Sequence, residues 1–303
     1  MTVNKKTLIA RIVVWAAIGV LAVVLLIWAA GGGNISGWFV HTITNGKADA
    51  VIRTEEIRED VDHLDIEWSS GNIRLTPVDG EGIRIVEKAS DPDRDTRLTY
   101  KVENGMLTVE SDDRVGFSLL RWNRIQTDLE ITVPRTTYER IVVDATSGTC
   151  DLSGLTAGEI LVELTSGTMI LDGTSAEKAN IDLTSGEIQG SDVDLKTVEI
   201  ELTSGKMTLG GKLYDVSLKV TSGNSQIRSS VLPDRLDAKT TSGDMTFWLP
   251  EGQGFSFDLK ITSGDFSSDF PLVASGDRRT YLSGGPQYHL SCTSGDLDLR
   301  IGR

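Results

Sequence analysis

Cysteine and aromatic side chains are both scarce in this sequence. Two cysteines among 303 residues exclude a disulfide framework, and an aromatic content of 6% argues against a large helical core. Glycine is plentiful by comparison, with 31 residues, which is typical of a fold with many tight turns. These proportions favour a β protein with a thin core.

Basic charge is in deficit, with 30 Lys and Arg against 44 Asp and Glu and a net charge of −14. Nucleic-acid binding requires an excess of Lys and Arg on one face, so we expect no nucleic-acid partner. The sequence also contains no nucleophile motif, phosphate-binding loop or zinc pattern. We therefore predict a protein that is not an enzyme and needs no cofactor.

A long uncharged run lies near the N-terminus, where residues 12–30 contain 19 consecutive residues without a charge. A helix of that length spans the hydrocarbon layer of a membrane, which is roughly 30 Å thick. Lys5, Lys6 and Arg11 come before the run, so the positive-inside rule places the N-terminus in the cytoplasm. A cleaved signal peptide ending near Ala30 is the alternative, but the apolar run is longer than its usual h-region. We predict a single-pass cell-membrane protein with a cytoplasmic tail and transmembrane helix over residues 1–30 and a linker over residues 31–50.

The tripeptide Thr-Ser-Gly recurs through the second half of the chain. Its copies begin at Thr146, Thr165, Thr184, Thr203, Thr221, Thr241, Thr262 and Thr293, so the spacings are 19, 19, 19, 18, 20, 21 and 31 residues. Apolar residues also recur at fixed places, for example Leu202 just before one tripeptide and Met207 two residues after its glycine. A straight strand would put residues five apart on opposite faces, so the chain must turn at the tripeptide. Glycine, which tolerates positive φ, suits that corner.

This pattern predicts an all-β fold, a parallel β-solenoid with rungs of about 19 residues in which each rung buries its inner face against its neighbours. An antiparallel meander is the competing fold, but it would not stack equivalent residues of successive copies. We predict the regular solenoid over residues 141–303, with a C-terminal cap around residues 270–290. Residues 51–140 are expected to form an N-terminal β cap and early coils around a Ser-Ser-Gly variant at Ser69. The pair Asn104-Gly105 predicts a type I′ hairpin turn in that region.

The Thr-Ser-Gly rungs from Thr146 to Gly295, the Ser-Ser-Gly strand and the Asn-Gly hairpin resemble the bacterial putative-adhesin family, a β-strand-repeat domain of unknown function. The resemblance covers roughly residues 60–303. It implies a β-solenoid outside the membrane in a membrane-anchored envelope protein. The family name suggests adhesion, and some members are associated with envelope stress. It implies no catalytic residues.

One outward column is a candidate cation site. The residues two places before each Thr are Asp144, Glu163, Asp182 and Glu201, followed by Lys219, Lys239 and Lys260. Stacked carboxylates repel by about 1 kcal/mol per neighbour in a water-like dielectric, and calcium or a cationic polymer would relieve that repulsion. A solvated acidic face, with no bound cation, is the alternative.

The cysteines and histidines point to no chemistry of their own. Cys150 and Cys292 occupy inward columns seven rung steps apart in sequence order, or roughly 34 Å at about 4.8 Å per step, so we expect two free core thiols. His41, His63 and His289 share no metal spacing.

We therefore expect a non-catalytic adhesion, interaction or structural module of the bacterial cell envelope that meets cell-wall polymer or another envelope protein. A polysaccharide-active β-helix enzyme is the alternative, and it would require a groove in which Asp and Lys or Arg converge.

Overall fold

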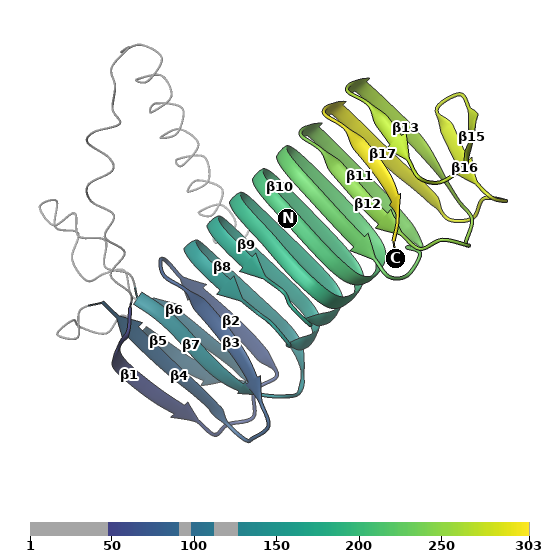
Figure 1. Cartoon of the computed structure of the whole chain (residues 1–303). Helices are drawn as coiled ribbons and strands as arrows, with labels where there is room; N and C mark the ends of the chain where they lie inside the picture. Colours follow the sequence, from purple (N-terminus) through teal and green to yellow (C-terminus); the bar gives the residue numbers. More distant parts are fainter. Residues whose placement is uncertain (1–47, 91–97, 112–126, 303) are drawn as a thin grey trace, which may run out of the picture. The chain divides into compact units, whose positions relative to one another are not determined.

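The computed structural model describes residues 48–90, 98–111 and 127–302, which belong to one compact unit over residues 47–303. Every regular element in these ranges is a β-strand, and the strands join into a single sheet (Figure 1). Within the same ranges, no helix has the length and apolarity needed to cross a membrane, and the predicted span over residues 12–30 lies outside them. The strands are β1 (Ala50–Ile57), β2 (His63–Trp68), β3 (Ile73–Val78), β4 (Ile83–Ala89), β5 (Leu98–Glu103), β6 (Met106–Ser111), β7 (Thr127–Pro134), β8 (Thr137–Asp151), β9 (Thr156–Ile170), β10 (Ser175–Ser229), β11 (Arg235–Ser242), β12 (Met245–Leu249), β13 (Phe255–Ser263), β14 (Phe266–Ser268), β15 (Leu272–Ser275), β16 (Arg278–Tyr281), β17 (Gln287–Ser294) and β18 (Leu297–Ile301).

The middle of the stack consists of parallel rungs that follow one another along the chain. Strand β8 pairs in parallel with β9, with Thr137 opposite Thr156 and Ser147 opposite Ser166. Strand β9 pairs with the first part of β10 in the same way, with Ser185 opposite Ser166. The tripeptides therefore lie one above another, as Figure 1 shows for the diagonal stack of ribbons. The all-β solenoid expected from the repeat is confirmed.

The inward columns form the core. Leu202 and Met207, on the two sides of one tripeptide, are both buried, as are their neighbours Leu183 and Ile188. Thr203, next to Leu202, is exposed. Residues five apart in a straight strand would lie on opposite faces, but Leu202 and Met207 both face inward. This confirms that the chain turns at the tripeptide.

The corner requires glycine for two independent reasons. Gly186 has a φ of +138°, in the region that side chains other than glycine rarely adopt. A Cβ atom there would also overlap the carbonyl oxygen of Gly167 in the neighbouring rung. Each corner glycine makes the same close approach to the rung before it, so the stack can close to sheet spacing only with glycine at this position.

The C-terminal end departs from sequence order. Strand β17 pairs in parallel with both β11 and β13, and β18 pairs with both β12 and β14. The rung that contains Thr293 is therefore inserted between the rungs of Thr241 and Thr262, although it comes last in the sequence. The count of seven rung steps between Cys150 and Cys292 rested on the expectation that each successive rung adds to the end of the stack. That expectation was wrong, because rungs with the same column pattern can pair in either order.

The N-terminal end is interleaved in a comparable way. Strand β2 pairs with β8 on one side and with β6 on the other, and β3 lies between β8 and β7. The Ser-Ser-Gly rung, which is first in the sequence, is thus second in space. The outermost rung, β6 with β7, is covered along both arms by the antiparallel strands β5 and β4. The predicted type I′ turn is present between β5 and β6, because Asn104 and Gly105 both have positive φ.

Hydrogen bonds between side chains and backbone at the corner link the rungs in the same order. The Oδ1 atom of Asp244 accepts a hydrogen bond from the backbone N–H of Asp296, at 2.9 Å, and Oδ1 of Asp296 accepts one from the N–H of Asp265, at 2.8 Å. At the other end, Oδ1 of Asn72 accepts from the N–H of Thr149. These bonds pair backbone groups that the corner turns away from the sheet ladder.

Candidate functional site

The acidic column lies on the outer face of the stack, where the sequence placed it. Asp144 stands opposite Glu163, and Glu163 stands opposite Asp182. Glu201 follows, and the ammonium group of Lys219 lies 3.1 Å from its carboxylate. The column is longer than the sequence indicated, because Glu67 stands opposite Asp144 and Glu110 stands opposite Glu67.

Burial and neighbouring charge act together on this column. Partial burial, reinforced by the charges of Asp144 and Asp182, raises the pKa of Glu163. Burial also raises the pKa of Asp182, with the charges of Glu201 and Glu199 adding to the effect. Within the described residues, however, these carboxylates do not gather around one point as metal ligands would. The column is a continuous acidic stripe that runs across the strands, along the axis of the stack.

The rung order also changes the basic part of this column, which the sequence placed after Glu201. Lys239 stands opposite Ser291, and Ser291 stands opposite Lys260. The three lysines that the sequence placed in succession are therefore interrupted by the serine of the inserted rung. The acidic part of this face meets its first lysine at Glu201 and Lys219.

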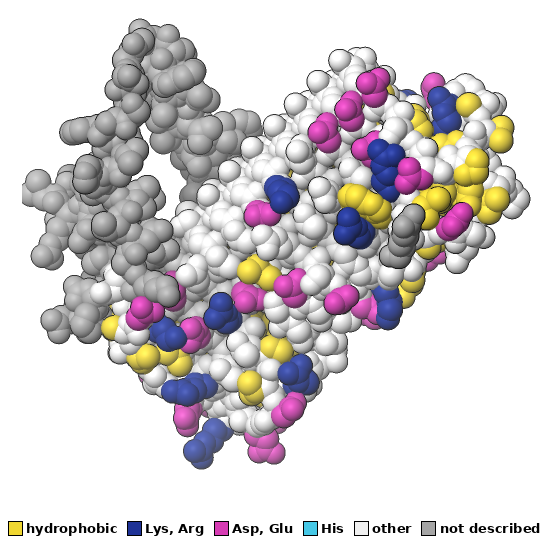
Figure 2. Space-filling model, in the orientation of Figure 1, with side chains coloured by type: hydrophobic (Ala, Val, Ile, Leu, Met, Phe, Trp, Pro, Cys, Tyr) yellow, Lys and Arg dark blue, Asp and Glu magenta, His cyan; other side chains and the backbone are white. Residues whose placement is uncertain are grey.

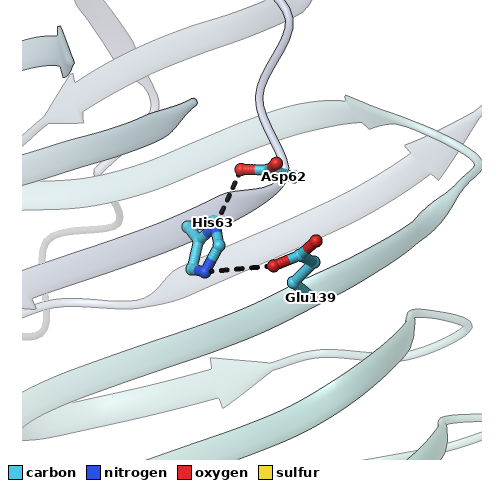
Figure 3. Close-up of side chains that lie close together, drawn as sticks. All are labelled: Asp62, His63 and Glu139. Carbon is cyan, nitrogen blue, oxygen red and sulfur yellow. Dashed lines mark hydrogen bonds and ion pairs between the residues drawn. The ribbon is translucent and has the colours of Figure 1, made fainter. Parts of the chain in front are cut away.

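A second cluster brings together a histidine and two carboxylates at the start of β2 and β8 (Figure 3). The Nδ1 atom of His63 lies 2.7 Å from Oδ1 of Asp62, and its Nε2 atom lies 3.6 Å from Oε2 of Glu139. The hydrogen bond with His63 lowers the pKa of Asp62. Because the two ring nitrogens face different carboxylates, His63 bridges Asp62 and Glu139 in an exposed ion-pair cluster. Sequence spacing did not reveal this cluster, since it depends on the pairing of β2 with β8.

A groove of about 740 Å³ opens where several rungs turn at the ends of β10 and β12. Its lining includes Gly210, Gly211, Arg228, Trp248 and Pro250. The guanidinium carbon of Arg228 lies 4.2 Å from the centre of the Trp248 ring, in a cation–π stack. Register explains this contact, because Arg228 and Trp248 stand opposite each other in β10 and β12.

Arg300 stands opposite Trp248 on the side away from Arg228. The guanidinium groups of the two arginines differ in their ion pairs. Arg300 lies 2.8 Å from Asp298 and 3.2 Å from Asp269. Within the described part of the chain, Arg228 forms no ion pair, and Asp192 is the one carboxylate that lines the groove. Within the described residues, no ion pair joins Asp192 to Arg228.

The two cysteines are buried and free, as expected for core residues. Burial raises the pKa of the Cys150 thiol to about 12, so the thiol stays protonated and a poor nucleophile at neutral pH. Because the rung of Thr293 is inserted, the two residues are separated by six rung steps and not the seven counted along the sequence. Of the histidines, His289 lies 3.5 Å from Asp258, and His41 lies outside the described residues.

The stacked parallel rungs and the glycine corner define the class as a β-solenoid of the kind found in repeat-based domains. The family model described as Toastrack DUF4097 matches residues 61–300, and the chain belongs to that family, a group of adhesin-like domains of unknown function. No protein with a curated function matches the chain.

The solved structures that match the chain share little sequence with it. A structure described as a putative lipid binding protein from Parabacteroides distasonis has 14% identity and a TM-score of 0.47, and covers 82% of this chain and 96% of its own. One described as a putative adhesin from Bacteroides fragilis has 13% identity and a TM-score of 0.35, with the same two coverages. One described as a putative cell adhesion protein from Clostridium sporogenes has 9% identity and a TM-score of 0.30, and covers 82% of this chain and 99% of its own.

Proposed function

We propose that this chain is a membrane-anchored, extracytoplasmic and non-catalytic interaction module of the bacterial cell envelope. The membrane anchor is the uncharged run over residues 12–30, and the solenoid is the part that meets cell-wall polymer or an envelope protein. The groove that contains Arg228 and Trp248 is the contact site.

The observation that carries this proposal is the stack of Arg228 on Trp248. The indole face holds the guanidinium group in place, and no carboxylate of the described residues neutralises it. A guanidinium group of this kind offers several N–H donors to an anionic or hydroxyl-rich ligand. The glycines that line the groove, Gly210 and Gly211, add backbone that a ligand can approach closely.

Binding of the full-length chain to bacterial cell-wall sacculi, measured with and without removal of their anionic polymers, tests the contact site. Arg228→Gln should weaken binding by about 10- to 150-fold, since a charge-assisted hydrogen bond is worth about 1.5–3 kcal/mol. Arg84→Gln is the matched control, because Arg84 is an exposed arginine on β4, away from the groove. Equal binding by the wild-type chain and both variants would rule out the groove.

The topology has its own test in intact spheroplasts. Because Lys5, Lys6 and Arg11 precede the uncharged run, protease added outside should degrade the solenoid part of the chain. Permeabilised spheroplasts provide the control for protease activity. Protection of residues 48–303 in the intact spheroplasts would contradict the proposed orientation.

A further inference from the structure

The last rung in space, formed by β13 and β14, leaves part of its outer edge unpaired. The hairpin of β15 and β16 covers β13 only from Phe255 to Asp258. Within the described residues, no strand pairs with the outer side of residues 259–263, and β14 pairs only with β18. The opposite end of the stack differs, because β4 and β5 cover both arms of its outermost rung.

The unpaired backbone groups can be assigned from the hydrogen bonds already made. The N–H of Leu259 donates outward, to the carbonyl oxygen of Asp277 in the hairpin turn. Strand backbone groups alternate in direction, so the N–H and C=O of Ile261 point to the same open side. On the other arm, the carbonyl of Asp265 accepts from Leu297 in β18, which leaves the groups of Phe266 facing the open side.

The side chains that line this edge are the exposed end of the core. Leu259, Ile261 and Phe266 are only partly buried, whereas Leu202 and Val220, in the same column as Ile261, are almost inaccessible. Figure 2 shows hydrophobic side chains gathered at this end of the stack. An edge with free backbone groups and a half-covered core is a template for another strand.

The edge is self-complementary about the corner. The sequence Leu-Lys-Ile-Thr-Ser before the corner and Gly-Asp-Phe-Ser-Ser after it carries inward residues at mirrored positions, 261 and 266. If a second copy runs antiparallel along the edge, Ile261 stands opposite Phe266 of that copy, and Phe266 stands opposite its Ile261. Both pairs consist of residues whose backbone groups face the open side, as an antiparallel ladder requires.

We propose that this open edge pairs with the same edge of a second copy, which gives a twofold, end-to-end dimer of the solenoid. The interface is isologous, because each copy contributes the same eight residues, 260–267. The occupant is a second copy of this chain and not another strand donor, since the pairing uses the mirrored pattern of the edge itself.

Charge supports the same register. Lys260 and Asp265 are exposed, and neither side chain has a partner among the described residues. In the antiparallel pairing, Lys260 is diagonal to Asp265 of the second copy, a separation of about 7–8 Å that a lysine side chain can bridge. The twofold axis provides this contact twice.

The β15–β16 hairpin limits the length of the pairing, because the carbonyl oxygen of Asp277 already accepts the N–H of Leu259. The ladder between the two copies therefore runs from Lys260 to Ser267, and it stops before the hairpin at one end and before the end of β14 at Ser268 at the other. The N-terminal strand β1 lies at the other end of the stack (Figure 1), so the dimer directs its two N-terminal ends away from each other.

Disulfide trapping with the full-length chain in detergent tests the register. Ile261→Cys on an affinity-tagged chain is mixed with Phe266→Cys on an untagged chain under mild oxidation. A hydrogen-bonded antiparallel pair has Cα atoms about 5.5 Å apart, within the range of a disulfide, so the mixture should give a covalent heterodimer. Each variant alone should not cross-link, because residue 261 of one copy lies far from residue 261 of the other. Lys260→Cys mixed with Ser267→Cys provides a second pair on the outward face, in case the apolar positions do not tolerate cysteine.

The mass of the chain provides the second measurement. Light scattering should give about twice the 32.8 kDa of one chain, and Ile261→Lys should restore a single chain because it places an unpaired charge against Phe266 of the second copy. Val273→Lys is the matched control, since Val273 is 70% exposed on the hairpin outside the edge. A wild-type chain that stays monomeric at 100 µM, or cross-linking of Ile261→Cys with itself as readily as with Phe266→Cys, would overturn the proposal. The pairing does not depend on the membrane anchor or on the groove, so these results are separate from the tests of the proposed function.

Discussion

Rungs β8, β9 and the first part of β10 are neighbours both in sequence and in space, whereas the rung of β17 and β18 is last in sequence and next to last in space. Both regions use the same corner glycine and the same inward columns. The middle therefore shows what one rung requires of its neighbour, and the C-terminal end shows that a rung accepts any neighbour with the same columns. What distinguishes the end is its closure, by a hairpin that covers one arm only.

The corner glycine of the middle should give the largest effect. Gly186→Ala places a Cβ atom inside the carbonyl of Gly167 and forces alanine to a φ of +138°, so we expect a loss of more than about 4 kcal/mol or failure to fold. Gly276→Ala in the end hairpin is the control. Its φ is also positive, at +61°, but nothing lies within 4 Å of the added Cβ atom, so the loss should be about 1 kcal/mol. Similar urea midpoints for the two variants would show that close stacking is not what selects glycine.

The inward column of the middle gives the next effect. Leu202 is 1% exposed, so Leu202→Asp buries a carboxylate without a partner and should cost more than about 3 kcal/mol. Thr203→Lys, on the exposed neighbour, should change stability by less than about 0.5 kcal/mol. Thermal unfolding of both variants measures the difference, and equal melting temperatures would remove the basis for the column assignment.

The inserted rung can be tested at Tyr288 in β17. Its hydroxyl donates to the carbonyl oxygen of Pro233 at 2.7 Å, which joins the last rung in sequence to the loop before β11. Tyr288→Phe should cost about 1 kcal/mol and speed amide exchange in residues 287–301. Tyr138→Phe removes a similar bond, to Pro134 at 3.1 Å, from the regular part of the stack. A loss in Tyr138→Phe with none in Tyr288→Phe would contradict the inserted position of β17.

Removing charge from the acidic column should give the smallest change in stability, and this change should be a gain and not a loss. Adjacent carboxylates repel by about 1 kcal/mol or less, so Glu163→Gln with Asp182→Asn should raise the melting temperature by about 2–4 °C at pH 7. Calcium should add nothing beyond sodium chloride at matched ionic strength, since the described carboxylates of the column do not gather around one point. A calcium-specific stabilisation that this double variant abolishes would show that the column binds the ion.

The same column sets a pH dependence with a definite sign. The pKa values of Asp144, Glu163 and Asp182 are raised in the folded chain, so the folded state takes up protons at a higher pH than the unfolded state does. Stability from these groups therefore increases as the pH falls from neutral through the raised pKa values, and the increase ends near the ordinary carboxyl pKa of about 4. Glu163→Gln with Asp182→Asn should flatten this part of a melting-temperature profile.

The sequence predicted the rung, but not the order of rungs at the ends. Alternation and the phase change between Leu202 and Met207 are local, so they can be found within one copy of the repeat. The order at the ends depends on which rung pairs with which, and every rung carries the same columns. The spacing of 31 residues before Thr293 marked an interruption, but the direction of the return lies in pairings that the sequence does not contain.

Some features of the candidate sites also had a signal in the sequence, and one had none. Glu67 could have been added to the acidic column, because it stands two residues before Ser69 as Asp144 stands two before Thr146. Arg228 and Trp248 also occupy one column, five residues after their glycines, so the stack in the groove had a signal in the sequence. The meeting of His63 with Glu139 had none, since it depends on the long-range pairing of β2 with β8.

The inserted rung also constrains how the protein is made. Synthesis proceeds from the N-terminus, so β13 and β14 emerge before β17 and β18, the strands with which they finally pair. The slot between the rungs of Thr241 and Thr262 therefore stays unfilled until residues 287–301 have been made. The middle of the stack can form before these residues exist, but the C-terminal end of the stack is completed only afterwards, by a slow long-range pairing step.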